Sequence, residues 1–150
     1  MKKIDKKQLL TPTFILSAVA FLLALAGFIA ILVSNGVPGY NLGGIVWFAL
    51  AIVGAMLCVA AAVALSLLFE DKELFVTILN LVALILLMLA FGGIIMQRAI
   101  LASAQFTYDA ENAVGWSALN SSLTTVAACF ISAVLLAVQA FLPVKKSSSN

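Results

Sequence analysis

Residues 67–75 read LLFEDKELF, with four consecutive charged residues between two long apolar runs. The flanking runs cover about residues 44–69 and 74–100. Each exceeds the roughly 20 apolar residues that a helix needs to cross a hydrocarbon core of about 30 Å. A polar connection this short makes two long helices antiparallel neighbours. The stretch therefore predicts a helical hairpin that crosses a membrane twice.

Two further apolar runs, at about residues 13–33 and 118–142, flank the hairpin. The chain of 150 residues is 65% hydrophobic and 9% charged, whereas a soluble domain is about 45–50% apolar and about 25% charged. The first run is longer than the roughly 7–15 apolar residues of a signal peptide, so we interpret it as an uncleaved span. The predicted fold class is all-α: an integral membrane antiparallel four-helix bundle, with residues 1–150 as a single domain.

Local signals predict where the spans begin and end. Thr11 and Pro12 suit the cap and the first residue of the first helix. Asn35 or Gly36 is expected to end that helix in the left-handed conformation. Asp71 is a candidate cap for the third helix, and Pro143 is expected to end the fourth.

The placement of basic residues predicts the orientation. With four spans, one side of the membrane receives seven of the eight: Lys2, Lys3, Lys6, Lys7, Lys72, Lys145 and Lys146. Arg98 alone falls on the other side. Because positive charge stays cytoplasmic, we expect both termini in the cytoplasm and the protein in the plasma (inner) membrane. Arg98 itself is interpreted as a snorkelling side chain at the membrane edge, with a buried functional charge as the alternative.

Small and weakly polar residues recur at helical spacing in every run and predict the packing faces. The expected faces are Ser17, Ala20, Ala24 and Gly27 in the first run; Gly54, Cys58, Ala62 and Ser66 in the second; Asn80, Ala83, Ala90 and Gln97 in the third. The most polar members form a candidate polar helix seam: Asn80, Ser122, Thr125, Ser132 and Gln139. We interpret the seam as packing, with a conduction path as the alternative, because no Asp, Glu, Lys or His lies within a predicted span.

The polar segment Ser103–Trp116 is the candidate recognition surface. Its candidate partner contacts are Asp109, Glu111 and Trp116. Thr107 could cap a short amphipathic helix over Tyr108–Val114 that lies on the outer leaflet as a lid. A docking site for a partner protein and a plain connector remain the alternatives.

Several chemistries lack their residues. The chain has no histidine and two cysteines, both in apolar runs, so Ser-His or Cys-His catalysis and a closed zinc site are not expected. No catalytic, cofactor-binding or metal residue is predicted, and nucleic-acid binding has no basic stripe. We expect a non-enzymatic structural or accessory subunit in the lipid bilayer, with a membrane protein partner or a homo-oligomer. The alternative is an oligomeric permeation unit for a small solute or ion.

Overall fold

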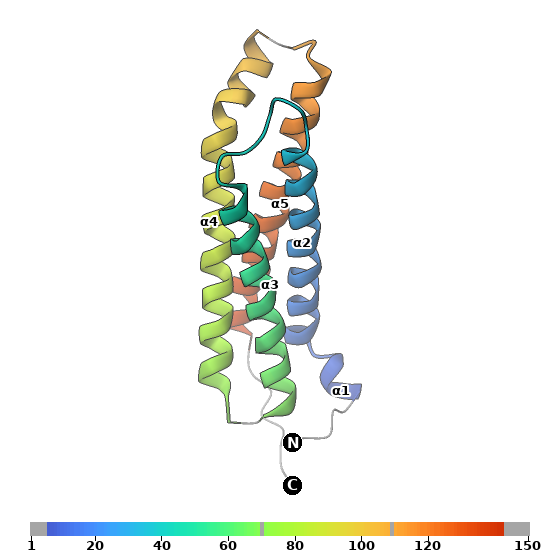
Figure 1. Ribbon diagram of the computed structural model, residues 1–150. Helices are drawn as coiled ribbons and strands as arrows, with labels where there is room; N and C mark the ends of the chain where they lie inside the picture. Colours follow the sequence, from blue (N-terminus) through green and yellow to red (C-terminus); the bar gives the residue numbers. More distant parts are fainter. Residues whose placement is uncertain (1–5, 70, 109, 143–150) are drawn as a thin grey trace.

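The computed structural model describes residues 6–69, 71–108 and 110–142, and these form helices and their connections (Figure 1). The helices are α1 (Lys6–Leu9), α2 (Pro12–Asn35), α3 (Ile45–Leu68), α4 (Glu73–Thr107) and α5 (Ala113–Phe141). The last four are each long and apolar enough to cross a membrane. The predicted all-α four-helix bundle is therefore confirmed. The predictions for six residues concern positions outside the described ranges: Lys2, Lys3, Asp109, Pro143, Lys145 and Lys146.

The four long helices run antiparallel around a common core, and each packs against the next (Figure 1). Helix α2 packs against α5 and α3, and helix α4 packs against α3 and α5. The start of α2 lies at the same end as the α3–α4 connection, which we call the Lys72 end. The opposite end, formed by the α2–α3 loop and the turn before α5, is called the Tyr40 end (Figure 1).

Helix α2 begins as predicted and ends differently. The Thr11 side chain accepts a hydrogen bond from the Phe14 amide, and Pro12 opens the helix. Gly36 ends α2 with φ −74°, a right-handed conformation, so the predicted left-handed end is wrong. The left-handed glycines are Gly39 and Gly44, in the loop itself. The Asn35 side chain accepts a hydrogen bond from the Leu42 amide, which connects the loop to the end of α2.

Helix α4 also departs from the prediction at both ends. Lys72 is its N-cap residue and makes no side-chain cap bond, so Asp71 is not the cap. The helix continues through Thr107, whose hydroxyl donates to the Ser103 carbonyl one turn earlier. The predicted short helix over Tyr108–Val114 is wrong, because α5 begins at Ala113 and is capped by Asn112. With 35 residues, α4 is about 52 Å long, well beyond a hydrocarbon core.

The buried faces agree with the prediction on α2, on α5 and at Ala83 and Ala90 of α4, and they differ mainly on α3. All four residues predicted for the first span are buried in α2. In α3 the buried residues are Ile52, Ala55, Val59 and Ala62, so the prediction is confirmed at Ala62 and is wrong at Gly54, Cys58 and Ser66. In α4 the face reads Ala83, Leu87, Ala90, Ile94, Arg98 and Gln105. Arg98 therefore takes the place expected for Gln97, which is exposed.

Helices α3 and α4 come close where the Phe48 ring lies on Gly93. A Cβ added at Gly93 would overlap the ring, whereas one added at Gly92 would meet no atom within 4 Å. Glycine at position 93 therefore sets the approach of the two helices.

We expect Gly93→Ala to lower the free energy of unfolding by about 1–3 kcal/mol through overpacking. The adjacent Gly92→Ala serves as the control and should be neutral or slightly stabilising. Unfolding can be followed in detergent by tryptophan fluorescence. A Phe48→Leu substitution should restore stability to Gly93→Ala, and equal effects at the two glycines would contradict this packing.

Candidate functional site

The polar residues of α5 bond mainly to α2, at four levels along the bundle. The Ser17 hydroxyl donates to the Gln139 side chain at 2.9 Å. The Ser132 hydroxyl donates to the Ala20 carbonyl at 2.7 Å. The Thr125 hydroxyl donates to the Gly27 carbonyl at 3.1 Å.

The fourth level lies nearest the Tyr40 end. There the Ser34 hydroxyl donates to the Ala118 carbonyl at 3.0 Å and lies 2.5 Å from the Ser122 hydroxyl. Of the five residues of the candidate polar helix seam, Ser122, Thr125, Ser132 and Gln139 thus join α5 to α2 and are buried.

Asn80, the fifth seam residue, lies elsewhere. It is half-buried on α4, and its side-chain oxygen is buried without a hydrogen-bond partner. It belongs to α4, which packs against α3 and α5, and it makes none of the hydrogen bonds between α2 and α5. Asn80 is therefore separate from the other four seam residues.

Arg98 is the charged centre of the Tyr40 end. Only 8% of its surface is exposed, so the expected snorkelling is wrong and the side chain is buried between the helices. Its Nε donates to the Ser122 hydroxyl at 2.9 Å, and its Nη2 donates to the Ser34 hydroxyl at 3.0 Å. The same Nη2 donates to the Tyr40 carbonyl at 2.7 Å. One side chain of α4 thereby holds α2, α5 and the α2–α3 loop.

Tyr40 carries this network on to the start of α5. Its hydroxyl accepts from the Asn112 side-chain nitrogen at 2.6 Å. The Asn112 oxygen accepts from the Gly115 amide at 3.1 Å and caps the helix. The Gln97 side chain on α4 donates to the Gly43 carbonyl and fixes the other end of the same loop. The loop is thus bonded to both α4 and the cap of α5.

Gln105 is fully buried beside the first turn of α5. Neither its side-chain nitrogen nor its oxygen has a hydrogen-bond partner. A Cβ added at Gly115 would lie 2.8 Å from the Gln105 Cδ, so the absence of a side chain there makes room for the amide. Burial of an unbonded amide costs about 1–3 kcal/mol, which makes this the least satisfied polar group near Arg98.

The candidate partner contacts lie past this polar cluster. Trp116 is half-buried, donates from its indole nitrogen to the Ala110 carbonyl and packs edge-on against Phe106. Glu111 is exposed. Asp109 lies outside the described residues. Trp116 therefore stabilises the turn between α4 and α5, while Phe106 and Tyr108 are more exposed, at 75% and 86%.

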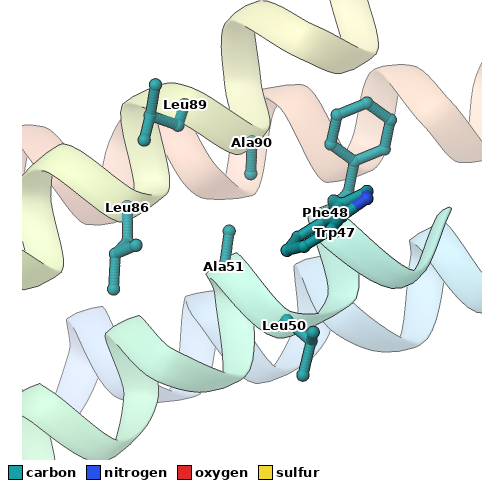
Figure 2. A pocket seen from close by; sticks show the side chains of 7 residues that line it. All are labelled: Trp47, Phe48, Leu50, Ala51, Leu86, Leu89 and Ala90. Atoms are coloured by element: carbon teal, nitrogen blue, oxygen red, sulfur yellow. The ribbon is translucent and has the colours of Figure 1, made fainter. Parts of the chain in front are cut away.

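A shallow apolar groove of about 400 Å³ lies between α3 and α4 (Figure 2). Its walls are Trp47, Phe48, Leu50, Ala51, Leu86, Leu89 and Ala90. Every lining side chain is apolar or, in Trp47, aromatic with a single N–H. The groove can hold hydrocarbon and supplies no group for acid–base or nucleophilic chemistry.

The sequence had partial signals for the site. Ser122 was predicted as a seam residue, whereas Ser34, Tyr40 and Gln105 were not singled out. Ser34 follows Gly27 by seven residues, and Gln105 follows Arg98 by the same interval. Continuing the predicted face of the first span by one heptad would have found Ser34, whereas the predicted face of the third span passes through Gln97 and leads to Ala104, so it misses Gln105. The hydrogen bond that the Tyr40 carbonyl accepts from Arg98 has no sequence signal, because every residue has a backbone carbonyl.

The cluster provides directed N–H and O–H groups and one cation. No group of three or more His, Cys, Asp or Glu residues that could hold a metal ion occurs in the described part of the chain. The cysteines of α3 and α5, Cys58 and Cys129, are free. The arrangement therefore suits binding and helix packing. The chain matches no protein-family model, no curated protein and no solved structure.

Ser122→Ala should lower the free energy of unfolding by about 1–3 kcal/mol, because it leaves the buried Arg98 Nε without its acceptor. Ser121→Ala is the matched control. Its hydroxyl bonds only to the Ser117 carbonyl on its own helix, so its loss should cost less than about 0.5 kcal/mol. Chemical unfolding in mixed micelles measures both. Similar losses of unfolding free energy in the two variants would show that the hydrogen bond from Arg98 to Ser122 does not stabilise the bundle.

Gln105→Leu should raise the free energy of unfolding by about 1 kcal/mol, because it removes a buried amide that has no partner.

Gly115→Ala alone should lower the free energy of unfolding, because the new methyl group meets the Gln105 side chain. The loss should shrink in the double variant Gly115→Ala with Gln105→Ala. Thermal unfolding of the four proteins forms a double-mutant cycle, and simple additivity would contradict the contact.

Proposed function

We propose that this small integral membrane protein is a non-enzymatic accessory subunit that meets a partner membrane protein through its Tyr40 end. Both termini are cytoplasmic in this proposal, because the charge pattern puts seven of eight basic residues there, and the membrane is the plasma (inner) membrane. The Tyr40 end is then the outer end. The observation that carries the proposal is the exposed apolar tip of the α4–α5 hairpin.

This tip is the part of the hairpin that extends beyond the α2–α3 loop (Figure 1). The loop bonds to α4 at Gln97 and Arg98. Helix α4 continues to Thr107, about 14 Å farther along its axis. The exposed large side chains on this extension are Ile100, Phe106, Tyr108 and Val114. Large apolar side chains that are exposed at the end of a hairpin favour a contact with another protein or with the membrane surface, and we propose the former.

The bonding of the α2–α5 interface favours this proposal over permeation through one chain. At each of the four levels, the polar side chain of α5 bonds to α2. Buried hydroxyls and amides of this kind are common packing contacts worth roughly 0.6–2 kcal/mol each. A conduction path along this interface would have to break those bonds and provide others for the solute.

The double variant Asp109→Ala with Glu111→Ala should weaken recovery of the partner when the tagged protein is purified in mild detergent at native expression level. The matched control is Asp71→Ala with Glu73→Ala, which removes two acidic residues at the Lys72 end and should leave recovery unchanged. The expected loss is about tenfold, which corresponds to about 1.4 kcal/mol. Quantitative mass spectrometry of the purified complexes measures it.

A photo-crosslinking amino acid at Phe106 should give one discrete adduct with the same partner, while one at Phe130, which lies in the apolar part of α5, should give none. An adduct of twice the chain's 15.7 kDa would indicate a homo-oligomer instead.

Two other outcomes would contradict the proposal. Equal recovery of the partner by the double variant at Asp109 and Glu111 and by its control would mean that the turn is only a connector. Solute flux in liposomes that is lost in Ser132→Leu with Gln139→Leu would favour the permeation alternative.

A further inference from the structure

The level of Arg98 along the bundle matches a membrane interface. Arg98 follows Glu73 by 25 positions, which is about 37 Å along α4. A bilayer has a hydrocarbon core of about 30 Å and measures about 40–45 Å with its headgroups. With Glu73 at one interface, the guanidinium lies at the depth of the headgroups on the other side. Phosphate groups of lipids occupy that depth.

The guanidinium has unused donors on one nitrogen. Nε–H bonds to Ser122, and the two N–H groups of Nη2 bond to Ser34 and Tyr40. Nη1 has no acceptor among the described residues, and it is not one of the buried side-chain atoms that lack a partner. The small exposed part of Arg98 therefore includes Nη1, whose two N–H groups take no part in the network.

The charge of Arg98 is also not balanced within the described residues. No carboxylate oxygen of residues 6–69, 71–108 or 110–142 lies within 4.0 Å of it, and its three acceptors are neutral. The C-terminal end of α2 offers roughly half a negative charge at Ser34. That partial charge is smaller than the full positive charge of the guanidinium.

We propose that Arg98 binds the phosphate group of an anion through Nη1, with Ser34, Ser122 and Tyr40 holding the guanidinium in place. A guanidinium that is held by three neutral acceptors and keeps two free N–H groups is suited to bind oxygen anions, because charge-assisted bonds of this type are short and strong. The phosphate can belong to a lipid headgroup or to free inorganic phosphate. This inference rests on the geometry of Arg98 and does not depend on the proposed partner protein.

The test compares three probes on the full-length protein in neutral detergent: phosphatidylglycerol, phosphatidylcholine with the same acyl chains, and inorganic phosphate. Thermal unfolding is followed by tryptophan fluorescence. We expect phosphatidylglycerol at saturation to raise the midpoint by about 3 °C or more. The rise should vanish in Arg98→Gln. It should persist in Lys72→Gln and in Lys6→Gln with Lys7→Gln, which remove basic residues at the opposite end.

The probes distinguish the sources of the phosphate. A rise with either lipid that requires Arg98 assigns a headgroup, and a rise with inorganic phosphate that requires Arg98 assigns the free anion. Should Arg98→Gln fail to fold, Arg98→Lys keeps the charge and loses the planar fork, and native mass spectrometry of the wild type still counts bound lipid. The proposal is overturned if no probe stabilises or binds the wild type. It is equally overturned if the rise in the unfolding midpoint is lost in Lys72→Gln or in Lys6→Gln with Lys7→Gln but persists in the variants of Arg98.

Discussion

The hydrogen bonds of Arg98 connect parts of the chain that are far apart in sequence. One guanidinium on α4 bonds to Ser122 of α5, Ser34 of α2 and the carbonyl of Tyr40 in the loop that leads to α3. Burial of an unpaired charge near a membrane is costly, and this cost is reduced only when all three acceptors are in place. The side chain therefore fixes how the three helices and the loop meet at the Tyr40 end.

The rest of the bundle is held by smaller contributions. Lipid tails are as apolar as the helix surfaces, so burial of leucine against leucine gives little net force between helices. Close approach of small residues and hydroxyl-to-carbonyl bonds take that role along α2 and α5. Gly27 illustrates both, since its carbonyl accepts from Thr125 and an added Cβ would lie 3.3 Å from the Ala128 side chain. Helices α3 and α4 instead meet through Phe48 on Gly93.

This division explains which faces could be predicted from the sequence. On α2 and α5 most of the buried residues are small or carry a hydroxyl or amide group, and these stand out against an apolar background. On α3 the buried face includes Ile52 and Val59, which are the same kind of residue as those facing lipid. Hydrophobic periodicity carries no information there, because both sides of the helix are apolar. The number and approximate limits of the spans follow from hydropathy alone.

The position of Arg98 could not be predicted for a different reason. The α4 face advances through Ala83, Leu87, Ala90 and Ile94 in steps of four and three, and the next member is position 97 or 98. Local chemistry favours Gln97, because a neutral amide costs less to bury than a guanidinium. The choice is reversed by acceptors on other helices, Ser34 and Ser122, which lie 64 and 24 residues away. A buried charge is determined by the groups that receive its hydrogen bonds, and here those groups come together only when the bundle has formed.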